Sequence, residues 1–278
     1  MDFISSEMVL YLLLTGSVVG FLSGLLGIGG GVIIIPTLLW LLSGCGLDDQ
    51  ILTHVVFGTS LAVGTGTALS SSTAHRKRVK ISTRLVLMLA VGSITGAQLG
   101  GYAAHLLTGK ILQIGFGTLL LFISYLLLRP LKDGRSRGGN PSGMLSGKPV
   151  LVGLGLIVGS VSAIIGTGGA ILTTTILVLF LKCPIHRTVG ITSSMMVFTA
   201  TSGALAYIFN GWGLENLPPY SLGYVNLYLM MALVTTSTIT AKLGVRLAHR
   251  IDPRPLQQVL GVFLLLIAAE ILTSNLTT

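Results

Sequence analysis

Hydrophobic residues occur in long stretches, and short segments that hold most of the charged residues separate them. The stretches run over 8–43, 54–74, 85–104, 111–128, 149–181, 188–209, 222–245 and 256–273. A helix needs about 20 apolar residues to cross a bilayer, and most of these stretches are close to that length. The pattern therefore predicts an all-α, polytopic membrane protein.

The first and fifth stretches are too long for one crossing. As continuous helices they would extend about 54 and 50 Å, whereas the hydrocarbon core of a bilayer is about 30 Å thick. Glycines interrupt both, at Gly27-Ile28-Gly29-Gly30-Gly31 and at Gly166-Thr167-Gly168-Gly169. Each glycine costs about 1 kcal/mol in a helix interior, so a cluster should break the helix. We expect a broken helical hairpin at each place.

The composition agrees with a membrane location. Of 278 residues, 51% are hydrophobic and 9% are charged, and the mean hydropathy is +0.88. A soluble domain has about 25% charged residues, so the composition excludes an ordinary soluble enzyme. The two cysteines, Cys45 and Cys183, have neither the number nor the spacing of a disulfide framework or a zinc site.

The two halves of the chain repeat each other. GSVVGFLSGLLGIGGGVIIIP, from Gly16, aligns with GLIVGSVSAIIGTGGAILTTT, from Gly155. Downstream, the pair Thr59-Ser60 matches Thr192-Ser193, and Gln98 matches Lys242. A linker rich in Gly, Ser and charge separates the halves, which gives a first repeat at 1–131, a cytoplasmic linker at 132–148 and a second repeat at 149–278. Repeats of this size are the usual construction of secondary transporters.

The basic residues predict how the chain is oriented. The net charge is +9, and most of the 17 Lys and Arg residues lie at 76–84, 129–148, 182–187 and 246–254. The positive-inside rule places these segments in the cytoplasm and both termini outside. The first stretch of each half then starts and ends on one side, as a hairpin does, and the halves have opposite topology. Eight simple crossings in parallel halves would leave a basic loop outside, so we prefer the inverted arrangement. Nucleic-acid binding is not expected, because the positive charge flanks apolar segments.

The glycine breaks are the first candidates for a substrate site. A new helix begins after each cluster, so its free backbone amides and its positive dipole end point into the break. Two such ends meeting near the midplane would bind an anion without a buried Lys or Arg. The alternative is that these glycines only permit close helix packing, as we expect for the GxxxG series that begin at Gly16 and Gly92.

Hydroxyl groups supply further candidates. Thr and Ser side chains can donate hydrogen bonds to oxyanions without burying a charge, although each can equally bond to its own helix. The candidates with matching places in the two halves are Thr59, Ser60, Thr192, Ser193 and the neighbouring Ser194. Gln98 and Lys242 also match, and Lys242 either faces the substrate or extends toward the cytoplasmic boundary.

Other chemistry is not indicated. The histidines, His54, His75, His105, His186 and His249, all fall at segment ends and should be interfacial, and Glu270 should be solvated near the outer end of the last span. No carboxylate lies at the centre of a span, which disfavours a cation substrate. The sequence has no nucleotide-binding loop and no GxSxG or HExxH motif, so we expect no catalytic residue, no metal site and no cofactor.

The duplicated glycine motifs, followed by GTSLAV and ITSSMM, resemble the sulfite exporter TauE/SafE family over nearly the whole chain. The second half departs from the first by having Ala170 where Gly31 stands and Thr175 where Pro36 stands. The resemblance implies a cytoplasmic-membrane transporter of small organosulfur or carboxylate anions, such as sulfite, sulfoacetate and related sulfonates. From the two broken helices we expect a secondary transporter that works by alternating access, in which they meet at the midplane and face each side of the membrane in turn. Its partners would be the anion, the lipid bilayer and, in a homo-oligomer, further copies of the chain. A passive anion channel and a membrane scaffold without transport are the alternatives.

Overall fold

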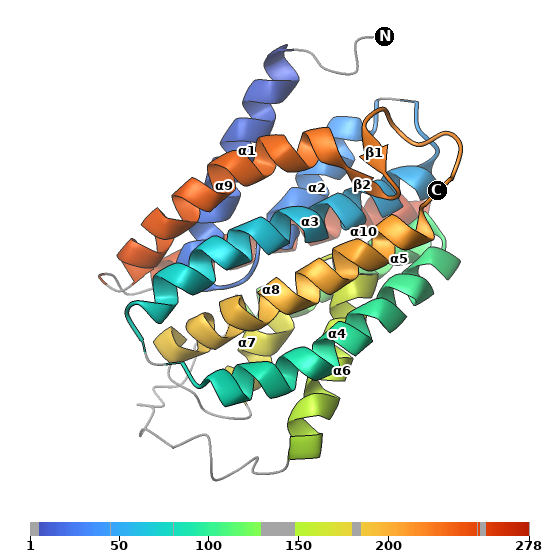
Figure 1. The fold of residues 1–278 in the computed structure, drawn as a ribbon. Coiled ribbons are helices and arrows are strands. Elements are labelled where there is room, and N and C mark those ends of the chain that lie inside the picture. Colours follow the sequence, from blue (N-terminus) through green and yellow to red (C-terminus); the bar gives the residue numbers. More distant parts are fainter. Residues whose placement is uncertain are drawn as a thin grey trace.

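The computed structural model describes residues 6–44, 46–79, 81–128, 148–179, 185–248, 250 and 254–277. Cys45, Cys183, His249 and the linker from 132 to 147 lie outside the described residues. The described chain is a bundle of helices with one small β-hairpin (Figure 1). The helices are α1 Ser6–Leu26, α2 Gly31–Leu42, α3 Asp49–Arg76, α4 Thr83–Leu106, α5 Gly109–Leu128, α6 Lys148–Ile164, α7 Ala170–Leu179, α8 Ile185–Asn210, α9 Leu227–Ala248 and α10 Arg254–Thr277. The strands are β1 Ser221–Leu222 and β2 Val225–Asn226, which pair antiparallel.

The structure confirms an all-α polytopic membrane protein. Within the described residues, six helices are long and apolar enough to cross a membrane, judged by length and composition: α1, α3, α4, α5, α8 and α9. The helix is also broken at both glycine clusters, since α1 ends at Leu26 and α6 ends at Ile164. The predicted start of the second stretch, at His54, was wrong, because α3 begins five residues earlier at Asp49. Asp48 caps this helix by accepting a hydrogen bond from the amide of Gln50 at 2.8 Å.

The outer helices pack in pairs that join the two halves of the chain. α1 runs along α9 in the same direction, and α6 runs along α4 in the same direction. Glycine makes both contacts possible: a Cβ on Gly20 would collide with the carbonyl oxygen of Ser237 in α9, and a Cβ on Gly96 would collide with that of Leu156 in α6. The GxxxG series therefore serve close packing, as their spacing predicts.

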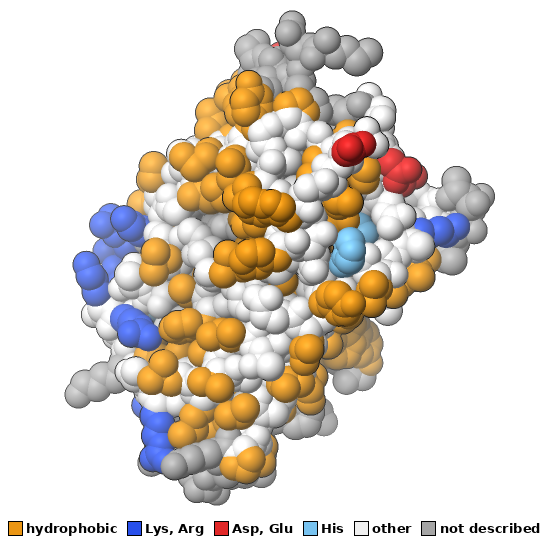
Figure 2. All heavy atoms as spheres, turned by 45° about the vertical axis from the view of Figure 1, so that its right-hand side comes forward, with side chains coloured by type: hydrophobic (Ala, Val, Ile, Leu, Met, Phe, Trp, Pro, Cys, Tyr) orange, Lys and Arg blue, Asp and Glu red, His pale blue; other side chains and the backbone are white. Residues whose placement is uncertain are grey.

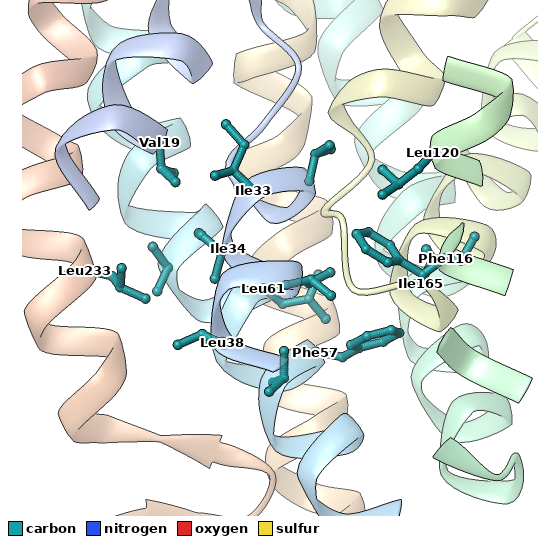
Figure 3. Packing of buried hydrophobic residues seen from close by; sticks show 14 of the residues in the cluster. Val19, Ile33, Ile34, Leu38, Phe57, Leu61, Phe116, Leu120, Ile165 and Leu233 are labelled. Atoms are coloured by element: carbon teal, nitrogen blue, oxygen red, sulfur yellow. The ribbon is translucent and has the colours of Figure 1, made fainter. Parts of the chain in front are cut away.

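The helices α3 and α8 form the centre of the bundle and run in opposite directions (Figure 1). Near one end Gly58 contacts Tyr207, and near the other the Oγ atoms of Ser71 and Ser193 lie 3.2 Å apart. Figure 3 shows side chains of α2, α3 and α5 packing around this centre, where the rings of Phe57 and Phe116 meet edge to face at 5.9 Å. The centre is thus a closely packed core.

Candidate functional site

The two glycine breaks lie against each other beside α3 and α8. A Cβ on Gly29 would lie 2.9 Å from the Cβ of Ala170, and a Cβ on Gly31 would lie 2.9 Å from the Cα of Thr167. The first residue of each of the helices α2 and α7 therefore packs against the opposite break. From this point α2 leads toward the start of α3, and α7 leads toward the start of α8. Because α3 and α8 are antiparallel, α2 and α7 lead to opposite ends of the bundle.

The backbone of the breaks explains why glycine stands there. Gly29 has φ +79° and Gly168 has φ +73°, which is the left-handed region that other residues adopt only at a cost. These two glycines occupy matching positions in the sequence repeat. The breaks are not identical, since Gly169 also has a positive φ, whereas Gly30 is right-handed with φ −79°.

The amides in both breaks form two groups of free donors. The first amides of a helix have no partner within that helix. Among the described residues, the amides of Gly29, Gly30 and Gly31 and those of Gly168, Gly169 and Ala170 donate no hydrogen bond. All of these residues are buried. Two positive helix ends and two sets of donors thus converge in one buried place, which is an arrangement that binds anions.

Hydroxyl groups hold the carbonyl groups of the breaks. Ser60 in α3 donates to the carbonyl oxygen of Gly166 at 3.1 Å. Thr174 in α7 donates to the carbonyl oxygen of Gly27 at 3.3 Å and lies 3.2 Å from Oγ1 of Thr192. Each break is therefore tied to a hydroxyl from the other half of the chain. These bonds occupy the carbonyl oxygens, which would repel an anion.

One methionine fills the space between the breaks. The Cε atom of Met196, in α8, would lie 3.2 Å from a Cβ on Gly29 and 2.9 Å from a Cβ on Gly64 or on Gly168. The side chain is 3% exposed and packs in a cluster whose other buried members are alanines: Ala68, Ala170 and Ala200. A long, flexible side chain thus ends among the smallest residues of the fold. The sequence pattern gives no signal for Met196, because only the tertiary contacts bring these small residues around it.

The other predicted hydroxyls are buried but bond elsewhere. Thr59 accepts a hydrogen bond from the amide of Asn226 at 3.0 Å, which ties α3 to the start of α9. Ser193 and Ser194 donate to carbonyl oxygens one turn earlier in α8, at 2.8 and 2.9 Å. Ser194 also lies 2.9 Å from the Oγ of Ser72. These three residues support the packing of α3 against α8 and α9.

The structure does not bring Gln98 and Lys242 to the breaks. Both side chains are exposed on the surface of the bundle. Gln98 donates to the carbonyl oxygen of Ser202 at 2.8 Å, which links α4 to α8. Ile28 and Thr167, by contrast, are buried within the breaks.

Among the ionisable residues, the placement of two histidines was predicted wrongly. His54 and His75 are each 1% exposed and lie inside the bundle, although both stand near helix ends. Neighbouring helices cover them, which a position in the sequence does not reveal. Glu270 is exposed near the end of α10, as predicted.

A bundle of membrane-length helices, with two broken helices meeting at a buried group of amides, is the construction typical of membrane transporters. The chain belongs to the sulfite exporter TauE/SafE family, whose profile matches residues 12–271. It is 28% identical over 263 residues to a probable membrane transporter protein of Haemophilus influenzae, covering 94% of this chain and 96% of the relative. It is 23% identical to the probable membrane transporter protein YunE of Bacillus subtilis, again covering 94% and 96%. A probable membrane transporter protein of Methanocaldococcus jannaschii is 26% identical, covering 92% and 94%. No solved structure matches the chain.

Proposed function

We propose that the protein is a secondary transporter of small oxyanions, which bind between the two glycine breaks and leave alternately to either side. The observation that carries this proposal is the pair of buried amide groups at the facing starts of α2 and α7. A small oxyanion presents several acceptor oxygens, which match several N–H donors. The family's description favours sulfite, and the same chemistry suits sulfoacetate, related sulfonates and small carboxylates.

The same proposal includes two inverted repeats, at 1–131 and 149–278. The helix pairs support this arrangement. The first helix of the first repeat, α1, packs on α9 of the second repeat, and the first helix of the second repeat, α6, packs on α4 of the first. Matching positive φ values at Gly29 and Gly168 support it as well. Inverted repeats give two forms of similar energy, each open to one side of the membrane, and alternating access needs both.

The charge distribution supports an orientation in the membrane. On the face that Figure 2 shows, most Lys and Arg side chains lie toward one end of the bundle and the acidic side chains lie toward the other. Arg76 and Arg246 lie in the last turns of α3 and α9, while Asp49 lies in the first turn of α3. We propose that the basic end faces the cytoplasm, that both termini lie outside and that the membrane is the cytoplasmic membrane.

Counterflow in proteoliposomes tests the proposal. Vesicles loaded with unlabelled sulfite or sulfonate are diluted into a trace of the labelled anion. A carrier exchanges the two and accumulates label transiently above its equilibrium level, which is the result we expect. A passive channel shows no such overshoot when the membrane potential is clamped. A scaffold shows neither uptake nor binding for any anion in a panel of sulfite, sulfonates and carboxylates.

A further inference from the structure

A second group of ionisable side chains lies at the end of the bundle where α3 begins, apart from the amides of the breaks. His54 in α3 is buried, and the centre of its ring lies 4.9 Å from that of Tyr224 and 6.4 Å from that of Tyr207. His105, near the end of α4, lies on the other side of Tyr224, with ring centres 6.0 Å apart. Four elements of the fold thus contribute to one cluster.

Both ring nitrogens of His54 face carbonyl oxygens. Nδ1 lies 2.7 Å from the oxygen of Gln50, one turn earlier in α3, and Nε2 lies 3.0 Å from the oxygen of Ala104 in α4. A carbonyl oxygen only accepts hydrogen bonds, and a neutral imidazole has a single N–H. In the neutral ring, one nitrogen lone pair would face an oxygen lone pair at hydrogen-bond distance. The imidazolium ion donates to both oxygens, so this geometry is satisfied by the protonated ring.

The surroundings of His54 also suit a cation. Ala104 lies in the last turn of α4, at the negative end of that helix dipole. The ring of Tyr224 is within the range of a cation–π contact. Among the described residues, no Asp or Glu is buried that could neutralise the charge. A bound anion would therefore be a natural counter-charge.

The other titratable groups near His54 do not supply a buried counter-charge. Tyr224 and His105 meet through the phenol oxygen and Nδ1, 3.3 Å apart. Burial raises the pKa of Tyr224, so its phenol remains protonated. From the neighbouring elements, Asp48 and Asp49 at the start of α3 and Lys110 at the start of α5 are exposed.

The cluster is connected to the second glycine break. Tyr207, beside His54, donates to the carbonyl oxygen of Ala163 at 3.1 Å, in the last turn of α6. Phe57, one turn after His54, packs against Gly166, where a Cβ would lie 2.9 Å from the Cβ of Phe57. Two neighbours of His54, Tyr207 and Phe57, therefore contact the residues of this break.

We propose that His54 binds the proton that is transported together with the anion, a proposal that rests on the transport function above. A proton from water adds to the free nitrogen of the neutral ring, and the resulting imidazolium joins α3 to the end of α4. Its positive charge favours the anion in the neighbouring break. Loss of that proton removes one of the two bonds and weakens anion binding. Proton and anion binding are then reciprocal, each strengthening the other.

The test measures how anion binding to the full-length protein depends on pH. The probe is an alkanesulfonate, because its own charge does not change between about pH 5 and pH 8, whereas sulfite titrates in that range. We expect Kd to fall as the pH is lowered, by at most about tenfold per pH unit for one proton. His54→Gln should remove this dependence. His105→Gln, the matched control in the same cluster, should retain it.

A flat profile in the wild type, or an unchanged slope in His54→Gln, would overturn the proposal. If His54→Gln does not fold, ¹⁵N NMR of histidine-labelled wild-type protein at fixed pH gives the answer. Addition of sulfite or the sulfonate should convert one histidine from the neutral to the doubly protonated form, and absence of any conversion would overturn the assignment. Failure of the transport function itself is distinguishable, because no anion in the panel would then show binding or counterflow.

Discussion

In the proposed transport function, the anion and the side chain of Met196 compete for the space between the breaks, so Met196→Ala should tighten anion binding. The terminal methyl group of Met196 lies against Gly29, Gly64 and Gly168. An anion must displace this side chain before it reaches the amides. Removing a methionine from full burial costs about 1.5–3 kcal/mol. Eliminating that cost corresponds to roughly a ten- to hundredfold lower Kd, since each 1.4 kcal/mol is tenfold. Larger sulfonates should also become acceptable substrates.

The neighbouring Met195 provides the control. It is as buried as Met196, at 1% against 3%, but it packs in a separate apolar cluster with Leu89 and Leu177. Either substitution removes a buried methionine and should cost about 2–5 kcal/mol of stability. Thermal unfolding measures this loss, and titration of the purified protein with sulfite measures the affinity. Equal affinities in wild type and Met196→Ala, or an equal gain in Met195→Ala, would refute the placement of the anion beside Met196.

Three further substitutions test separate parts of the structure. Gly168→Ala should cost about 1–2 kcal/mol for its left-handed backbone and should stop counterflow, whereas Gly153→Ala, whose Cβ would meet nothing, should transport normally. If both variants transport alike in proteoliposomes, the break is not part of the pathway. Thr59→Val leaves the amide of Asn226 without its acceptor and should lower the free energy of unfolding by about 1–3 kcal/mol, as measured by thermal unfolding. Thr59→Ser should restore that stability. An unchanged melting temperature for Thr59→Val contradicts this role. Gly96→Ala should separate α4 from α6 and cost about 1–3 kcal/mol or more, and normal stability in the same assay would argue against the close contact.

The membrane helices and the two breaks could be predicted from the sequence, because both depend on local properties. An apolar stretch of sufficient length specifies a crossing, and several adjacent glycines end a helix. The close packing of the helix that contains Gly92, Gly96 and Gly100 was likewise visible in its spacing. The same spacing explains why Gln98 does not face α6, since it lies two residues from each of two interface glycines and therefore on another face of α4.

The contents of the site could not be predicted, because they depend on contacts between distant parts of the chain. Nothing near Met196 in sequence indicates that glycines from both breaks surround its methyl group. His54 lies near a helix end, and its position in the sequence therefore predicts an interfacial residue. In the structure α4, α8 and the β-hairpin cover it. The hairpin itself was missed, since its two-residue strands lie within a region that reads as the start of an apolar span.

The position of a bound anion in a crystal shows whether the two breaks form the binding site. Selenite has the shape and charge of sulfite, and its selenium atom gives an anomalous signal that identifies it in a crystal. We expect one selenium position between the two breaks, with the oxygens of the anion within hydrogen-bond distance of the amides of Gly29 to Gly31 and Gly168 to Ala170 and the side chain of Met196 displaced. Selenium bound only at the basic end of the bundle, with the side chain of Met196 still between the breaks, would contradict the proposed binding site.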